Sequence, residues 1–144
     1  MHNYILEDLI IEGKKDTFFI PSIHFNGESG VCSIEGESYL EDSIRFYKKL
    51  YDWLNNFIIH VSKKIIFNVK LTYFNTSSEK GIFDLLMLLK KYKEDGGQVE
   101  INWFHAKDDE DSIEEAEDFI SDTNLSINLI SVSYTHLTLP TTPY

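Results

Sequence analysis

The chain has 144 residues, of which 42% are hydrophobic and 14% aromatic, and this suits one globular domain with a buried core and excludes intrinsic disorder. Aspartate and glutamate number 24 against 13 lysines and arginines, so the formal net charge is −11. Because this excess repels nucleic-acid phosphates and anionic lipid, we expect neither nucleic acid nor a membrane as partner, and a protein with a basic patch is the better expectation.

The single cysteine and the absence of long apolar runs bound the class of protein further. Cys32 alone excludes an intramolecular disulfide and a cysteine-based zinc cluster, and its apolar neighbours predict a buried, inert thiol. The sequence has neither a signal peptide at its start nor an apolar run of about 18 residues that could span a bilayer. We therefore expect a cytoplasmic protein.

Three strands are predicted before the first helix, at residues 4–11, 18–25 and 30–35. The Asn26-Gly27 dipeptide between the last two is typical of a hairpin turn. Pro21 within the second strand predicts an edge position or a bulge, because proline cannot donate a ladder hydrogen bond.

The first helix is expected at residues 39–58, with Ser38 and Glu41 as a capping box. Apolar residues at helical spacing predict its core-facing stripe: Ile44, Tyr47, Tyr51, Leu54 and Ile58. An alternating strand follows at 65–73, with Ile65, Phe67, Val69, Leu71 and Tyr73 expected on one face.

The rest of the chain continues the alternation of helices and strands. A helix is predicted from Ser77 to Glu94, ended by Gly96-Gly97, and it is followed by a strand at 99–104. A capping box of Ser112 and Glu115 predicts a third helix, and a last strand is expected at 126–130. The order βββ-α-β-α-β-α-β predicts an α/β fold with a mixed sheet and three main helices.

Residues 132–144 differ in composition from the preceding chain. They contain no Asp, Glu, Lys or Arg and hold two of the three prolines. The segment Val132–Leu137 resembles a translated sequencing adapter, so we expect a domain at 1–131 and a non-native tail at 132–144. A native, threonine-rich tail is the alternative.

The segment Thr72–Lys80 joins a strand to a helix through small polar residues. Thr76 with Glu79 fits a capping box, so a well-formed helix start is one interpretation. Three adjacent hydroxyls exceed what one cap requires, however. A helix N-terminus also accommodates a phosphate, so phosphorylation here would change the surface charge and leave the fold intact.

An acidic run between Asp108 and Asp118 holds eight carboxylates. It predicts a docking surface for a basic partner, a weak divalent-cation site, or a solvated helix start whose charges complement the helix dipole. The central glycine and alternating ligands of an EF-hand are missing, so we expect no metal site.

Signs of catalysis are weak. Ser77, His105 and an aspartate could form a nucleophilic site, but no G-x-S-x-G elbow, paired histidines or glycine-rich phosphate loop occurs. We expect a protein that is not an enzyme and that has no cofactor.

Three sets of segments carry a family resemblance: Gly36–Asp42 with Phe46-Tyr47 and Trp53-Leu54, Leu71–Ser78, and Trp103 with Asp108–Asp111 and Glu117-Asp118. The string Tyr73-Phe74-Asn75-Thr76-Ser77-Ser78 is the most specific of them. In these segments the sequence resembles the SiaC family of bacterial regulatory phosphoproteins. The resemblance implies a fold like that of the anti-sigma-factor antagonists (STAS).

It also implies a regulated function, with Thr76 as the phosphoacceptor and Ser77 as the second choice. A serine/threonine kinase would modify the site, a PP2C-like phosphatase would restore it, and the unphosphorylated form would activate a diguanylate cyclase. The expected partner surface comprises Asn75, Ser77, Ser78, Glu79, Lys80, Asp108, Asp109 and Asp111. A constitutive adaptor of the same fold and a small hydrolase or metal-binding domain using His105 and the acidic run stay as alternatives.

Overall fold

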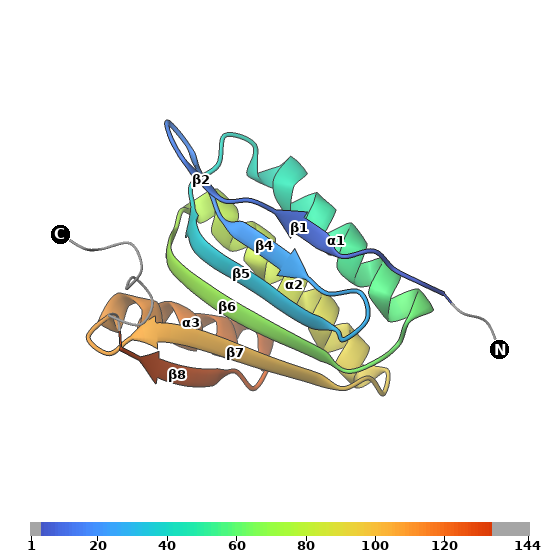
Figure 1. Cartoon of the computed structure of the whole chain (residues 1–144). Coiled ribbons are helices and arrows are strands. Elements are labelled where there is room, and N and C mark those ends of the chain that lie inside the picture. The colour runs from blue at the N-terminus through green and yellow to red at the C-terminus, as the bar shows by residue number, and fades with distance from the viewer. Residues whose placement is uncertain (1–3, 134–144) are drawn as a thin grey trace.

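The computed structural model describes residues 4–133, which form a sheet covered by three helices (Figure 1). The elements in chain order are β1 (Leu9–Ile11), β2 (Lys14–Lys15), β3 (Phe19–Ile20), β4 (Ser22–Phe25), β5 (Val31–Ser38), α1 (Ser43–His60), β6 (Ile65–Phe74), α2 (Thr76–Glu94), β7 (Val99–Ala106), α3 (Glu110–Thr123) and β8 (Asn128–Val132). The predicted α/β class, mixed sheet and three helices are confirmed. The likeness to STAS domains stays a prediction.

The main sheet has the strand order β1-β4-β5-β6-β7-β8. Strands β5 to β8 are parallel because a helix returns the chain between each pair. On the other side of β5, β4 is antiparallel to β5, and the edge strand β1 is antiparallel to β4. The predicted hairpin turn joins β4 to β5, and the Asn26 side chain accepts hydrogen bonds from the amides of Glu28 (3.0 Å) and Ser29 (2.8 Å).

The first two predicted strands are shorter and more broken than expected. Residues 4–8 lie outside any strand, and the predicted 18–25 strand is interrupted at Pro21, which separates β3 from β4. Because proline lacks an amide hydrogen, the ladder breaks there, and β3 pairs with β2 in a separate two-stranded sheet.

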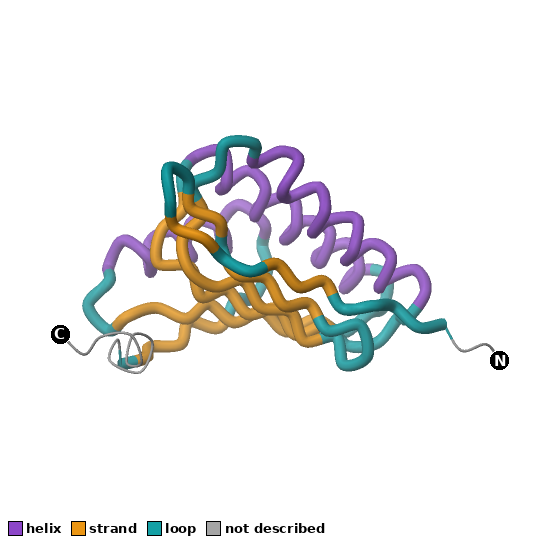
Figure 2. The backbone as a smooth tube through the Cα atoms, turned by 45° about the horizontal axis from the view of Figure 1, so that its top comes forward, coloured by secondary structure: helices purple, strands orange, loops and turns teal. Residues whose placement is uncertain are grey.

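All three helices cover one face of the main sheet (Figure 2). The core between them includes the fully buried Phe25, Phe67 and Trp103 from the strands and Leu54 and Leu86 from the helices. Cys32 is also buried there, and burial raises the pKa of its thiol, as the prediction of an inert cysteine requires.

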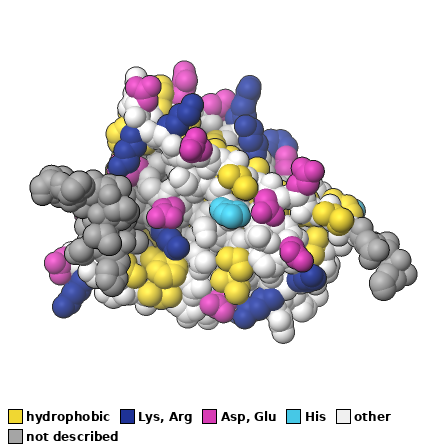
Figure 3. Space-filling view, in the orientation of Figure 1, with side chains coloured by type: hydrophobic (Ala, Val, Ile, Leu, Met, Phe, Trp, Pro, Cys, Tyr) yellow, Lys and Arg dark blue, Asp and Glu magenta, His cyan; other side chains and the backbone are white. Residues whose placement is uncertain are grey.

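The opposite face of the sheet is open. Asn68, Asn102 and Asn128 occupy the same register on β6, β7 and β8, and their side chains form a ladder with hydrogen bonds of 2.9 Å. Figure 3 views this face and shows apolar, acidic and basic side chains interspersed over it. Within residues 4–133, no helix has both the length and the apolar character needed to cross a bilayer.

The predicted caps of all three helices are wrong by a few residues. Asp42, Asn75 and Asp109 are the N-caps, and their side chains accept from the amides of Arg45 (3.1 Å), Ser78 (3.0 Å) and Ser112 (3.0 Å). The serines Ser38 and Ser112, predicted as caps, are buried and hydrogen-bonded inside the protein. Thr76, also predicted as a cap, is the first helical residue.

Two predicted core faces also need correction. On α1, Tyr47 and Leu54 are buried, but Ile44 is 83% exposed and Tyr51 37%, because the buried face turns instead toward Leu50, Trp53 and Phe57. On β6, Tyr73 is exposed and Phe74 buried.

A bulge between β5 and β6 causes the change at Tyr73. Gly36 pairs with Leu71 and Glu37 with Tyr73, so Thr72 is an extra residue in β6. Its hydroxyl donates to the Gly36 carbonyl oxygen at 3.3 Å. The extra residue reverses the alternation of side chains for the last two positions of the strand.

The predicted tail lies mostly outside the described residues. β8 continues to Val132, which pairs with Ala106, one residue beyond the predicted domain boundary. The proposed non-native origin of 132–144 stays a prediction.

Candidate functional site

Thr76 is exposed at the first position of α2, where the chain leaves the carboxyl end of β6. Asn75 caps the helix with both its groups: its side chain accepts from the Ser78 amide, and its carbonyl accepts from the Glu79 amide at 2.9 Å. Within residues 4–133, the Thr76 hydroxyl makes no hydrogen bond. This hydroxyl is therefore accessible and is not needed to hold the helix start together.

The hydroxyl of Ser77, in contrast, joins two helices. It lies 2.8 Å from the hydroxyl of Ser43 in the first turn of α1 and 3.3 Å from the Asn75 side-chain oxygen. Modification of the Ser77 hydroxyl would disturb its hydrogen bond with Ser43 between α1 and α2, whereas modification of Thr76 would not.

Ser78 is fully buried, which corrects its predicted place on a partner surface. Its hydroxyl donates to the Ser38 carbonyl oxygen (3.1 Å) and accepts from the Ser38 hydroxyl (2.8 Å). The Tyr47 hydroxyl lies 2.8 Å from Ser38 Oγ, and since the Ser38 proton points to Ser78, Tyr47 is the donor. Burial raises the pKa of Tyr47 to about 12, so the phenol keeps this proton.

This chain of hydrogen bonds fixes the start of α2 against α1 and the end of β5. The Asn75 amide adds a backbone bond to the Ser38 carbonyl oxygen at 3.1 Å. Because each buried hydroxyl has a partner, the arrangement is rigid and presents Thr76 in one position.

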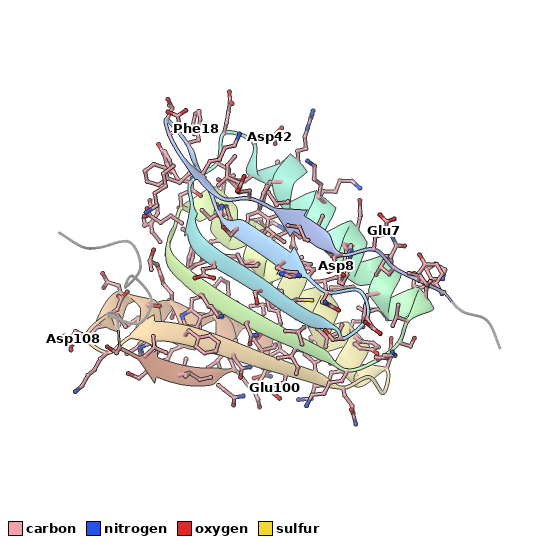
Figure 4. The ribbon with its side chains drawn as sticks, in the orientation of Figure 1. Glu7, Asp8, Phe18, Asp42, Glu100 and Asp108 are labelled. Carbon is pink, nitrogen blue, oxygen red and sulfur yellow. The ribbon has the colours of Figure 1, made fainter. Side chains whose placement is uncertain are left out.

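The acidic run lies on the other side of the same helix start. Five of its carboxylates line a pocket of about 350 Å³ together with Thr72, Tyr73 and Ser112: Asp109, Asp111, Glu114, Glu115 and Asp118. Glu79 of α2 is close enough to raise the pKa of Glu115, so the fold brings these two predicted regions together. Asp108 is exposed in the loop before α3 (Figure 4) and does not line this pocket.

The described residues do not form the nucleophilic site or the metal site that were the alternatives. His105 is buried, and its Nδ1 lies 2.9 Å from the Ala106 carbonyl oxygen, whereas Ser77 is bonded to Ser43 and Asn75. No hydrogen bond joins Ser77 to His105 in the described part of the chain. In that same part, no three His, Cys, Asp or Glu side chains are arranged to hold a metal ion.

The sequence interpretation missed a groove between α1 and α2. It has a volume of about 660 Å³ and ends beside Ser77, next to Thr76. Its lining residues are Ser43, Ile44, Tyr47, Lys48, Tyr51, Ser77, Lys80, Gly81, Asp84, Met87, Leu88 and Lys91. The helical spacing of Ile44 and Tyr51 predicts core residues and so hides the groove, along which both side chains lie exposed.

A pH dependence follows from Glu115, because burial and the neighbouring carboxylates Asp109, Asp111, Glu79 and Asp118 raise the pKa of its side chain to about 7. Between about pH 4.5 and 7, the folded protein holds a proton that the unfolded chain releases, so stability falls as pH rises through this window. Glu115→Gln cannot ionise. We expect it to raise the melting temperature relative to the parent protein by more at pH 8 than at pH 5.

Thermal denaturation monitored by circular dichroism at both pH values checks this expectation. Glu117→Gln, an exposed position on the same helix, is the control for loss of one charge. An equal effect of Glu115→Gln at pH 5 and pH 8 would contradict the prediction.

Comparison with known proteins agrees with the resemblance seen in the sequence. The family model described as SiaC family regulatory phosphoprotein matches residues 11–132. An uncharacterised protein of Pseudomonas aeruginosa strain UCBPP-PA14 is 32% identical over 117 residues, which cover 81% of this chain and 90% of that relative.

Solved structures of Pseudomonas aeruginosa proteins are similar as well. SiaC is 29% identical, with a TM-score of 0.78 over 87% of this chain and 98% of its own. SiaC in complex with the diguanylate cyclase SiaD, of which it is described as the activator, is 30% identical, with a TM-score of 0.80 over 87% and 100%. The description of SiaC as the activator of another protein agrees with the prediction that this chain is not an enzyme. The chain belongs to the SiaC family of regulatory phosphoproteins.

Proposed function

We propose that this protein is a cytoplasmic switch that binds and activates a diguanylate cyclase when Thr76 is unphosphorylated, and so controls cyclic-di-GMP signalling. A serine/threonine kinase adds the phosphate and a PP2C-like phosphatase removes it. The observation that carries the proposal is the Thr76 hydroxyl, which is exposed at the start of α2 and has no hydrogen bond within residues 4–133.

The position of Thr76 lets a phosphate change the surface without unfolding it. The phosphate carries a charge of about −1.5 to −2 at neutral pH, and a helix N-terminus accommodates such a charge. The capping bonds come from Asn75 and the buried bonds from Ser78, so neither set is broken.

The partner surface that we propose surrounds this hydroxyl. Asn75, Ser77, Glu79 and Lys80 lie beside it on α2, and Asp109 and Asp111 lie across the acidic pocket, with the exposed Asp108 in the loop before α3. A phosphate in such a contact costs desolvation and repels acidic groups of the partner. The solved complex of the related SiaC with SiaD supports a diguanylate cyclase as the partner.

Phosphorylation by the cognate kinase with Mg-ATP tests the site. Intact-mass spectrometry is expected to show one added phosphate on the parent protein and on Ser77→Ala, and none on Thr76→Ala. A phosphate retained on Thr76→Ala and lost on Ser77→Ala would move the site to Ser77.

Cyclase activation tests the switch. Thr76→Asp is expected to fold normally and to lose activation of the cyclase. Thr76→Asn, in which the new side chain has the shape of aspartate but no charge, should retain activation. Cyclic-di-GMP production is measured with each variant in excess over the cyclase. Full activation by the phosphorylated protein would contradict the switch and would favour a constitutive adaptor.

A further inference from the structure

β8 is the last strand of the main sheet, and within residues 4–133 no further strand pairs with its outer side (Figure 1). Alternate backbone amides and carbonyls of such an edge strand are free to pair with another strand. Proteins commonly prevent this pairing with a charged side chain, a proline or a bulge. β8 has none of these, because its sequence is Asn-Leu-Ile-Ser-Val and its pairing with β7 is regular.

The opposite edge of the sheet is protected. β1 has only three residues and lies between Asp8 and Glu12. The segment before it is fixed in place, since the Trp53 indole N–H donates to the Glu7 carbonyl oxygen at 2.8 Å and the Asp8 carboxylate accepts from the Gly27 amide at 2.9 Å. β8 is therefore the edge that is available for pairing.

Apolar side chains lie along β8 on both faces of the sheet. Leu129 pairs with the core residue Trp103, so it lies on the helix-covered face, where it is 39% exposed. Ile130 pairs with Phe104 on the open face, and both side chains are half-buried. A strand that docks beside β8 would cover apolar surface on each side of its backbone.

α3 extends this apolar strip on the helix-covered face. Ile113 and Ile120 are half-buried, and at about 100° per residue they lie on the same side of the helix. Asp111, Glu115 and Asp118 lie on the opposite side, where they line the acidic pocket toward α2. The side of α3 next to β8 is therefore largely apolar.

The distribution of charge favours a second copy of this chain as the partner. Two copies carry −11 each and repel one another, so their association is least opposed where carboxylates are absent. No Asp, Glu, Lys or Arg occurs from residue 123 onward, so β8 is neutral. A strongly acidic or basic peptide would find no opposite charge along this strand.

A twofold arrangement of two β8 strands matches their faces. Residues directly opposite one another in an antiparallel pair lie on the same face, so full overlap places Ile130 opposite Ile130 of the second copy and Leu129 opposite Ser131. The helix-covered faces of the two copies then lie on the same side, with Ile113 and Ile120 between the α3 helices. Because both copies use the same edge, the pairing closes as a dimer.

We propose that the β8 edge binds a second copy of this chain, so that two six-stranded sheets join into one and the α3 helices pack across the twofold axis. This inference goes beyond the proposed function and does not depend on it. Since β7 separates β8 from β6, which leads to Thr76, the pairing leaves the start of α2 exposed. Five strand residues span only about 17 Å, so the contact is small and we expect a reversible dimer.

Analytical ultracentrifugation of the full chain over a wide range of concentrations tests the dimer. Leu129→Lys and Ser131→Lys are expected to weaken dimerisation about tenfold or more, because each substitution places a charge on both paired strands. Ser131 is already polar and exposed, so its substitution does not disturb the core. Circular dichroism confirms that each variant is folded.

Ile10→Lys is the matched control for these two variants. Ile10 is 66% exposed on the opposite edge strand β1, and its substitution changes the net charge by the same amount. It should leave dimerisation within about twofold of the parent protein. An equal loss in all three variants would mean that net charge, and not the β8 edge, controls association.

The dependence on salt tests the chemistry of the contact. Because the proposed contact is neutral and the rest of the chain is acidic, the dimer should tighten as salt screens the repulsion between copies. Weakening by salt would indicate an ionic contact and would overturn the assignment to β8. Hydrogen exchange followed by mass spectrometry should slow in β8 and not in β1 as the dimer forms.

The remaining outcomes are equally decisive. A folded parent protein that stays monomeric at all concentrations overturns the inference, and so does a dimer that the β8 variants leave intact. A chain that ends at Ser133 keeps all of β8, so its failure to dimerise would assign the contact to residues 134–144 instead. Phosphorylation and cyclase activation are measured separately, and their failure would overturn the proposed function while the β8 dimer stands.

Discussion

Replacement of Trp103 by alanine is expected to lower the free energy of unfolding by about 3–5 kcal/mol. Trp103 is 1% exposed on β7 and lies against Phe74, with ring centroids 6.1 Å apart, and Phe119, with centroids 5.7 Å apart. Its indole N–H also donates to the buried Ser112 hydroxyl at 2.9 Å. The substitution leaves a cavity and removes the partner of a buried polar group, so both effects act in the same direction.

Urea unfolding monitored by circular dichroism measures this loss. Trp103→Phe keeps most of the packing and loses the hydrogen bond, so we expect it to destabilise the fold by less than half as much as Trp103→Ala. Since Trp103 and Ser112 connect the sheet to α3, a change of less than about 1 kcal/mol in Trp103→Ala would mean that α3 is not packed as described.

Gly81→Ala is expected to destabilise the protein by about 1–3 kcal/mol through overpacking. A Cβ atom at Gly81 would lie 2.3 Å from Cγ and 2.7 Å from Cβ of Tyr47, atoms that cannot move without displacing α1. Alanine is intrinsically better than glycine in a helix by about 1 kcal/mol, so a net loss of stability requires the steric effect to exceed this gain.

A double-mutant cycle with Tyr47→Ala separates the two effects. In the Tyr47→Ala background, the collision with the ring is gone and only the contact with the Cβ atom of residue 47 is left, so Gly81→Ala should destabilise the protein less than it does in the parent background. Equal effects of Gly81→Ala in both backgrounds, measured by denaturant unfolding, would show that the helices do not approach as closely as described at this position.

Local sequence patterns predicted the elements that depend on local chemistry. The hairpin turn at Asn26-Gly27 was predicted correctly because the Asn26 side chain acts locally, on the amides two and three residues later. The alternation of β6 was correct as far as Leu71, where it depends on one sheet face being buried. The first helix followed from its apolar periodicity, and the end of the second followed from Gly96-Gly97.

The same reasoning failed where residues distant in sequence compete for a side chain. Ser38 and Ser112 have the composition of helix caps, but their hydroxyls are bound by Ser78 and Trp103, and aspartates cap the helices instead. Ile44 and Tyr51 fit the core period of α1, yet the position of α2 leaves them beside a groove. Such competition depends on which helices become neighbours, and this is decided by the whole fold.

The surroundings of the candidate site were predicted in part, and the role of Thr76 stays a prediction. The succession of a strand, a cluster of hydroxyls and a helix pointed to this segment, and the family resemblance selected Thr76 within it. Ser78 is excluded from the partner surface by its burial, which depends on the packing of the whole domain. The proximity of Glu79 to Glu115 depends on the parallel order of β6 and β7, which sets α2 beside α3.

The extra residue at Thr72 has a consequence for how this protein can tolerate changes of chain length. Phe74 anchors the end of β6 in the core and Asn75 follows it directly as the cap of α2. Deletion of Thr72 would remove the bulge and restore strict alternation, with Leu71 and Phe74 still buried, Tyr73 still exposed and their pairing with Gly36, Ser38 and Glu37 unchanged. The end of β6 can therefore lose this one residue while Phe74, and with it the start of α2 that carries Thr76, keeps its orientation.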